Sequence, residues 1–364
     1  MRSATLQTCF GCNRRTAGRP HNGCRVRGRS FHPAAIHQRG RPPAGLIIAL
    51  PLCVTSPWHP YRSEWPSRLF HHAPIENAVK ILLDGNLRSR DDPENQREKD
   101  VAAAGVISAR SHAHNSARLY FRPRTPTQYH IEGIRKKGEC QYGDDSHAPV
   151  FIMMVFVARS VLAFPTTKFC DRNMQLGHAE PGDTEEYFST IPFDKVFHEG
   201  GIGNDRTIIE HRCAEVLATS PMPLVNTLQW IYCRTAAERE TLLFMLGDKK
   251  SQWSSRIVIS DDLLVFERKY VFVDSVTMSP NGLVFQLNPR VDQKKIHMKA
   301  EAWDKDGKQV INFLNPELDA QPPPAQGKRW RVPANLPNGN YLVHIDLEGH
   351  LAYRGTLALG PRLV

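Results

Sequence analysis

One acidic residue stands where it can do chemistry at a sugar carbon. Glu215 lies in the run RCAEVL (212–217), at the start of an apolar, strand-like segment over 214–224. A glycine-containing stretch, HEGGIGND (198–205), comes shortly before it. When a glycosidic bond breaks, the sugar carbon takes on oxocarbenium character, and a nearby carboxylate stabilises that charge. The alternative is a surface acid without a role, so the rest of the chain must decide.

The elements that must position this acid form a mixed pattern of strands and helices. RLFHHA (68–73) predicts a strand, and PIENAVKILLDG (74–85) predicts a helix with a proline at its start and a glycine at its end. The apolar run over 150–157 predicts a buried strand. Further strands are predicted from 117, near 215, over 228–233 and over 256–260, and an amphipathic helix over 235–246. This mixture indicates an α+β domain over 65–264.

The sequence changes in character near Arg268. Short β segments follow, separated by turn signals such as DKDG (304–307) and PNG (337–339). About seven short strands indicate a small all-β sandwich of immunoglobulin-like build over 265–364. This region contains no catalytic cluster, so we expect it to bind a partner or to cap the catalytic domain.

The first 64 residues differ from the rest in charge. They hold ten arginines, no lysine and one acid, whereas the remaining residues are near neutral although the whole chain carries +10. Any nucleic-acid contact must therefore come from a local groove and not from global charge. Because this segment is rich in Pro and Gly without periodicity, we expect a disordered leader over 1–64. An organellar transit peptide or an upstream start codon is the alternative.

Cysteine usage and hydropathy suggest where the protein works. The eight cysteines are sparse and unpatterned, which is typical of a reduced, cytoplasmic setting. A zinc knuckle at Cys9, Cys12, Cys24, His32 and His37 lacks the paired spacing of its second half, so we expect no metal. The apolar run over 45–54 is only about half as long as a membrane span requires.

Several common enzyme motifs are missing from the sequence. There is no G-x-x-x-x-G-K-[ST], G-x-S-x-G or H-E-x-x-H. The nearest approach to a dinucleotide fingerprint is Gly201-x-Gly203, which lacks the third glycine. P-loop nucleotide chemistry, a Rossmann dehydrogenase, an α/β-hydrolase and a zinc protease are therefore disfavoured.

Four segments in order resemble motifs of the DarT-type DNA ADP-ribosyltransferases, the toxins of toxin–antitoxin pairs. They are FHHAPIENAVKIL (70–82), HNSARLYFRPRTPTQY (114–129), FCDRNMQ (169–175) and RCAEVL (212–217). In the second segment the residues in register are His114, Tyr120, Phe121, Pro123, Arg124, Pro126 and Tyr129. The resemblance covers the middle half of the chain.

The resemblance implies an enzyme that cleaves NAD, its co-substrate, at the nicotinamide glycosidic bond. It then transfers ADP-ribose to a base of single-stranded DNA. Glu215 is the implied catalytic carboxylate, which stabilises the ribose cation and takes a proton from the acceptor base. A carboxylate at a distance of about 4 Å contributes about 4 kcal/mol at an effective dielectric near 20, which is on the order of a thousandfold in rate.

The same resemblance implies residues that bind NAD. His71 is expected to hold the ribose, whereas Ala73 stands where the family has Thr and offers only backbone atoms. Tyr120 presents an aromatic face for nicotinamide, and the planar fork of Arg124 suits a diphosphate or a DNA phosphate. The alternatives are a core histidine, a tyrosine packed in its strand and a solvated arginine.

A catalytic arginine is also implied in the loop before the second segment. Arg97, in PENQREKD, is the nearest counterpart, and Arg110 is the alternative. Asp171-Arg172-Asn173 is expected to fold a loop near the site through side-chain hydrogen bonds.

The segment 191–212 is the implied acceptor-binding loop. Aromatic rings can stack a base there and cations can hold phosphates. The candidates are Phe193, Phe197, Lys195, Arg206 and Arg212. The alternatives are core aromatics and solvated cations. A neutralising antitoxin, either a macrodomain-type hydrolase or a binding protein, is the implied partner. RNA or protein as acceptor, or a non-catalytic binding module on the same scaffold, are the competing functions.

Overall fold

The computed structural model describes residues 60–101, 114–140, 142–288, 294–320 and 329–360. The leader up to residue 59, including the zinc alternative, lies outside these ranges, as does Arg110. Residues 60–64, which the sequence assigned to the disordered leader, instead belong to a 3-10 helix, η1 (Pro60–Ser67). The reason is Trp65, which is fully buried and whose indole Nε1 donates to the Leu263 carbonyl at 3.0 Å.

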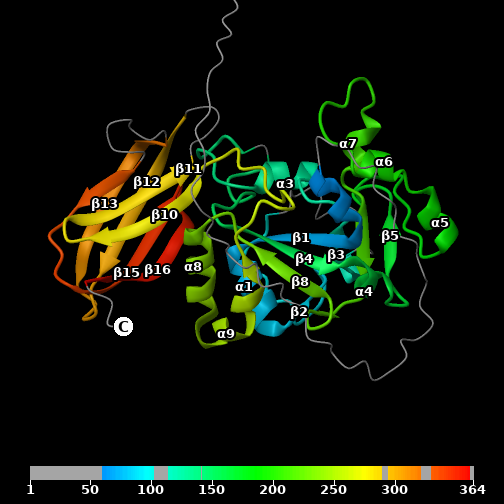
Figure 1. Cartoon of the computed structure of the whole chain (residues 1–364). Helices are drawn as coiled ribbons and strands as arrows, with labels where there is room; N and C mark the ends of the chain where they lie inside the picture. Colours follow the sequence, from blue (N-terminus) through cyan, green and yellow to red (C-terminus); the bar gives the residue numbers. More distant parts are fainter. Residues whose placement is uncertain (1–59, 102–113, 141, 289–293, 321–328, 361–364) are drawn as a thin grey trace, which may run out of the picture. The chain divides into compact units, whose positions relative to one another are not determined.

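A seven-stranded sheet forms the centre of the predicted catalytic domain (residues 65–264, the catalytic region), in the order β5-β6-β3-β1-β4-β8-β9 (Figure 1). Its neighbours pair antiparallel except β8 and β9. The strands are β1 (Arg68–Pro74), β3 (Ala117–Tyr120), β4 (Phe151–Val157), β5 (Lys168–Cys170), β6 (Glu215–Ala218), β8 (Leu228–Tyr232) and β9 (Ile257–Val258). A separate short pair consists of β2 (Asn86–Leu87) and β7 (Met222–Pro223). The predicted strands form, whereas β5 was not predicted because three residues carry little pattern.

The two predicted helices also form. The first, α1, runs from Ile75 to Asp84 and ends at Gly85, whose φ of 76° is left-handed and suits glycine. The second, α8 (Ala236–Leu246), is capped by Thr235, whose side chain accepts from the Glu238 N–H. Shorter helical segments are α3 (Pro126–Ile131), α4 (Ala158–Leu162), α5 (Glu185–Thr190), α6 (Phe193–Val196), α7 (Thr207–His211), η3 (Gly247–Lys249), α9 (Lys250–Trp253) and η4 (Ser254–Arg256).

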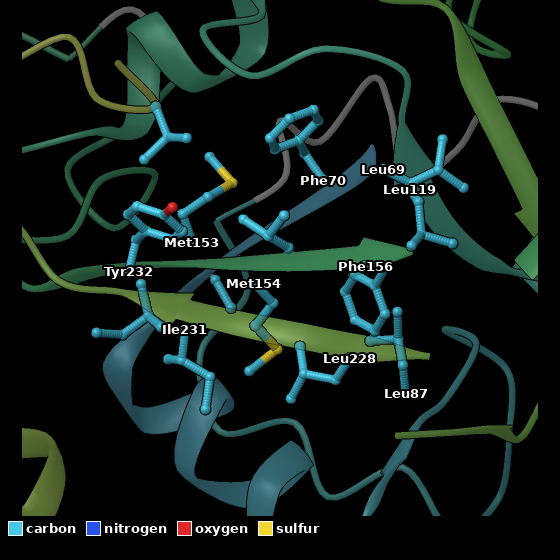
Figure 2. Packing of buried hydrophobic residues seen from close by; sticks show 14 of the residues in the cluster. Leu69, Phe70, Leu87, Leu119, Met153, Met154, Phe156, Leu228, Ile231 and Tyr232 are labelled. Carbon is cyan, nitrogen blue, oxygen red and sulfur yellow. The ribbon is translucent and has the colours of Figure 1, made fainter. Parts of the chain in front are cut away.

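The core of the catalytic region is built around β4. Six of its seven residues are buried, so both faces of this strand are covered. Figure 2 shows the consecutive residues Met153 and Met154 pointing to opposite sides of the sheet, as strand alternation requires. Side chains from β1 and β8, among them Phe70 and Ile231, pack beside them. This rigid centre fixes the neighbouring strands that carry the site.

The C-terminal region is all-β. One antiparallel sheet has the order β10-β11-β14 and the other β13-β12-β15-β16. Their bounds are β10 (Phe272–Ser279), β11 (Gly282–Asn288), β12 (Lys295–Trp303), β13 (Gln309–Asp319), β14 (Trp330–Pro333), β15 (Gly339–Leu347) and β16 (His350–Leu359). Both sheets contribute to one hydrophobic core. At the start of β15 the Tyr341 hydroxyl donates to the Pro337 carbonyl at 2.5 Å, the tyrosine corner of immunoglobulin-like sandwiches. The predicted fold class, an α+β core followed by such a sandwich, is confirmed.

Helix α8 connects the two regions through buried contacts. Ala237 belongs to the hydrophobic core of the sandwich. The Thr235 hydroxyl donates to the Val273 carbonyl at 3.0 Å, and the Tyr353 hydroxyl donates to the Glu240 carboxylate at 3.1 Å. The sandwich is therefore packed onto the catalytic region at a defined place.

Candidate active site

A cavity of about 640 Å³ opens beside strands β1, β3 and β6. Its wall brings together five of the predicted catalytic and NAD-binding residues, namely Glu215, His71, Ala73, Tyr120 and Arg97. Because these three strands are neighbours in the sheet, segments far apart in the chain meet at one place. The volume lies within the range of small-molecule sites.

Glu215 is the buried acid of this cavity. It is the first residue of β6, is 1% exposed and lies opposite Tyr120 on β3. Burial raises the pKa of its carboxyl group to about 7, and the Arg118 guanidinium and the Met174 backbone N–H partly offset this effect. The Arg118 Nη1 lies 3.4 Å from Glu215 Oε2. The carboxylate is therefore largely desolvated but still ionises near neutral pH.

The third motif forms a loop beside Glu215. Arg172 Nη2 pairs with the Asp171 carboxylate at 2.6 Å, and its Nη1 reaches Glu210 at 3.2 Å. The Asn173 side-chain oxygen accepts from the Gln175 N–H at 2.8 Å. These bonds fold the predicted loop next to the site and place Met174, whose backbone N–H lowers the pKa of the Glu215 carboxyl group.

His71 is held in one tautomer by the neighbouring strand. Its Nδ1 lies 2.8 Å from the Arg118 carbonyl oxygen, which can only accept, so Nδ1 carries the proton. Burial lowers the pKa of the His71 imidazole, so the ring is neutral near pH 7. Its Nε2 is then a hydrogen-bond acceptor that suits a ribose hydroxyl.

Tyr120 and Ala73 both line the cavity. The His72 ring stacks on Tyr120 with 5.3 Å between ring centroids and an interplanar angle of 7°. One face of Tyr120 is thus already covered, and a nicotinamide ring must use the other. Burial and the nearby Glu215 charge raise the pKa of the Tyr120 phenol, so it stays neutral. Ala73 is buried at the cavity wall and has no hydroxyl to offer.

The loop that carries Arg97 is fixed by Asn77 of α1. The Asn77 Oδ1 accepts from the N–H groups of Glu98 at 3.0 Å and Lys99 at 2.9 Å, and its Nδ2 donates to the Lys99 carbonyl at 2.6 Å. Arg97 Nη2 lies 3.7 Å from the Asp100 carboxylate. Asn77 is the asparagine of the first motif, and its side chain positions this loop at the cavity.

Arg118 is a cavity residue that sequence reasoning missed. It lies two positions before Tyr120 on β3, and both residues line the cavity. The strand alternation at 118 and 120 was the available signal, because a strand places such residues on one face. Its backbone binds His71 and its side chain contacts Glu215, so it links the two proposed site residues.

Arg124 does not line this cavity. Its Nη1 lies 3.4 Å from Glu199 and its Nε 3.9 Å from Glu267. The preceding Arg122 is buried, donates to the Val196 carbonyl at 3.2 Å and pairs with the Glu199 carboxylate. These two arginines anchor the segment that precedes Glu215.

The predicted acceptor residues also lie outside the cavity wall. Segment 191–212 contains α6 and α7, and Phe193 packs in an aromatic cluster, 5.7 Å from the Phe197 ring and 5.5 Å from the Phe121 ring. Phe197 itself is 2% exposed. The packing of these two rings favours a role in the core over base stacking.

The cations of the same segment differ in their surroundings. Lys195 Nζ lies 3.0 Å from the Asp205 carboxylate. Arg212 Nη2 donates to the Gly200 carbonyl at 2.7 Å and lies 2.7 Å from His198 Nδ1. Arg206 is exposed just before α7. Their roles as phosphate contacts stay predictions.

A family model described as "ssDNA thymidine ADP-ribosyltransferase, DarT" matches residues 70–264, more than half of the chain. The chain belongs to the DarT family. It is accordingly an NAD-dependent transferase that ADP-ribosylates single-stranded DNA. The recognition made from four short motifs is thereby confirmed, as is NAD as co-substrate.

Solved DarT structures are similar to the chain at low identity. Thermus sp. 2.9 DarT in complex with ADP-ribosylated ssDNA is 22% identical, covers 54% of this chain and 96% of its own, and has a TM-score of 0.44. The same protein in complex with NAD+ is 20% identical, covers 54% of this chain and 97% of its own, and has a TM-score of 0.42. Thermosipho africanus DarTG in complex with ADP-ribose is 15% identical, covers 59% of this chain and 54% of its own, and has a TM-score of 0.39. No curated protein matches the chain. Among the described residues no helix is long and apolar enough to cross a bilayer.

Proposed function

We propose that the cavity beside β1, β3 and β6 binds NAD and that Glu215 is the catalytic carboxylate. The observation that carries this proposal is the convergence of a desolvated acid, a neutral histidine and a cation-bearing loop on one cavity wall. His71 binds the nicotinamide ribose through Nε2. Arg97 contributes positive charge to the same wall, and Ala73 contributes backbone atoms only.

In the proposed reaction the bond between ribose C1′ and the nicotinamide nitrogen breaks, and its electron pair leaves with neutral nicotinamide. Glu215 stabilises the positive charge that develops at C1′. A ring heteroatom of the acceptor base then bonds to C1′ and loses its proton. Glu215, with a pKa of about 7, is suited to accept that proton.

The acceptor base is proposed to be thymine, in keeping with the description of the family. A single strand presents its bases unpaired, so the enzyme does not have to open a duplex. The exposed Arg206 and the partly buried Arg212 and Lys195 are proposed to hold phosphates on the acceptor side, and Arg124 remains a candidate for the same task. Phe193 is proposed to shape the acceptor loop from within the aromatic cluster.

The biological role we propose is that of a toxin or phage-defence effector in the cytoplasm. An enzyme that modifies DNA bases damages its own host, so an antitoxin is required. That antitoxin is proposed to be a macrodomain-type hydrolase that removes the modification, or a protein that binds the enzyme.

Incubation with NAD labelled in the adenine moiety tests this proposal. The full chain is given matched oligonucleotides that contain or lack thymidine, together with separate RNA and protein pools. We expect label only in the single-stranded DNA that contains thymidine. Label in RNA or protein alone would contradict the acceptor, and NAD binding without any transfer would favour a non-catalytic module.

A further inference from the structure

The sandwich reaches the wall of the cavity through a single turn. β15 and β16 are joined by Glu348 and Gly349, whose φ angles of 50° and 82° are both left-handed, as a two-residue type I′ hairpin requires. His350 follows this turn directly. Its Nδ1 lies 3.1 Å from the Nζ of Lys99, and Lys99 lines the cavity. A sandwich residue thus contacts the cavity wall.

The turn is itself fixed in place by the rest of the protein. The Glu348 carboxylate accepts from the backbone N–H of Lys137 at 3.2 Å and from that of His297 at 2.7 Å. Lys137 belongs to the catalytic region and His297 to β12 of the sandwich. Leu351 packs against the hydrophobic core of the catalytic region. The position of His350 is therefore set from both sides.

Lys99 is held at both ends. Asn77 binds its backbone N–H and its carbonyl oxygen, so helix α1 fixes the main chain. His350 fixes the ammonium group. A lysine ammonium only donates, so His350 Nδ1 must accept and the ring must be neutral. The His147 ring packs at 5.0 Å from that of His350, and burial lowers the pKa of both rings, which favours this neutral form.

We infer that the β-sandwich completes the NAD site: its β15–β16 turn presents His350 to Lys99 and so orders a cation for the NAD diphosphate. A lysine side chain is long and flexible, and ordering it before the ligand arrives removes part of the entropy cost of binding. His350 is thus a positioning residue that acts through Lys99. This inference rests on the proposed placement of NAD in the cavity.

The test is a calorimetric titration of the full chain with NAD, followed by transfer kinetics on the thymidine oligonucleotide. We expect His350→Ala to weaken NAD binding by roughly fivefold to tenfold, in line with the loss of a hydrogen bond to a charged group. The kcat at saturating NAD should stay within about twofold, because the inference places Lys99 at the diphosphate and not at the reacting carbon. His350→Asn, whose amide oxygen accepts a hydrogen bond, restores most of the affinity.

The matched control is His344→Ala, which removes a histidine of β15 that pairs with Asp346 within the sandwich. It should leave NAD affinity unchanged. A double-mutant cycle with Lys99→Met should show that the two effects are not additive. Wild-type affinity in His350→Ala, or strict additivity in the cycle, overturns the inference.

Two further results separate this inference from the proposed function. If His71→Ala weakens NAD binding while His350→Ala does not, the cavity is the NAD site and only the role of the sandwich is wrong. If His71→Ala and Lys99→Met both leave the affinity unchanged, NAD binds elsewhere, and the inference fails together with the placement on which it rests.

Discussion

The cavity wall and the acceptor loop use polar side chains in different ways. At the cavity, side chains from β1, β3, β6 and the Arg97 loop converge on open volume, and the buried Glu215 has the Arg118 guanidinium at 3.4 Å. In segment 191–212, Lys195 and Arg212 are engaged by neighbours within the segment, and Phe193 is packed among other rings. The proposed NAD site is organised in advance, whereas the proposed acceptor segment is organised first for its own folding.

The largest effect is expected for the central acid. Glu215→Gln keeps the shape of the side chain but removes the charge that stabilises the ribose cation. We expect kcat to fall on the order of a thousandfold, as the loss of about 4 kcal/mol implies, while NAD affinity changes by less than about threefold. Single-turnover transfer from labelled NAD measures this. Full activity in the variant would contradict the catalytic role of Glu215.

Phe193 tests whether the acceptor loop is a packed element. Phe193→Ala should lower the free energy of unfolding by roughly 2–3 kcal/mol, because a half-buried ring is removed from an aromatic cluster. Urea denaturation measures it, with Phe193→Leu as the control that retains most of the packing. An unchanged stability combined with weaker DNA binding would instead make Phe193 a base-stacking residue.

Arg118 tests the electrostatics of the cavity. In the pH profile of kcat/KM, activity should rise with pH as Glu215 ionises. The midpoint of this acidic limb should lie near pH 7, because the Glu215 pKa is about 7. Removal of a neighbouring cation raises the pKa of a carboxyl group. Arg118→Met should therefore move the limb to a pH about one unit higher, so that kcat/KM falls roughly tenfold at pH values below the limb. Arg118→Lys keeps the positive charge and should leave the limb where it is in the wild type.

Four other titratable groups near Glu215 do not account for such a limb. Burial raises the pKa of the Cys170 thiol to about 11 and that of the Cys213 thiol to about 12, so both stay protonated. Burial also keeps the Tyr120 phenol and the His71 ring neutral in this range. A limb that does not move in Arg118→Met would assign the titration to another group.

The smallest effect is expected on the DNA side. Arg206 is exposed, whereas the Lys195 ammonium is already paired with Asp205. We expect Arg206→Ala to weaken binding to single-stranded DNA a few-fold and to reduce the salt slope by about 0.7, the value for one phosphate contact. Lys195→Ala should change the slope less. If the salt dependence of DNA binding had the same slope in both variants and in the wild type, the DNA would not bind at segment 191–212.

Local signals in the sequence predicted the elements well. The proline and glycine that bracket α1, and the unbroken apolar run of β4, act over a few residues and were readable directly. The start of the ordered region was placed too late, because η1 is held by a bond from Trp65 to Leu263 that no local pattern reveals. The motifs located Glu215 and His71, which the structure brings to one cavity.

Contacts between distant segments were not predictable. The approach of Arg118 to Glu215 depends on the register of β3 against β6. The contact of Lys99 with His350 depends on how the sandwich packs on α8. The sequence presented Phe193 and Lys195 as candidates for DNA, since nothing local distinguishes a ring or cation that faces its own loop from one that faces a ligand.

The most direct test of the central claim is a crystal structure of the full chain with a non-reactive NAD analogue. We expect the analogue to occupy the cavity with ribose C1′ within about 4 Å of the Glu215 carboxylate, the range in which the charge is effective. We also expect a ribose hydroxyl to donate a hydrogen bond to His71 Nε2. A dinucleotide bound in another place, or a ribose turned away from Glu215, would contradict it.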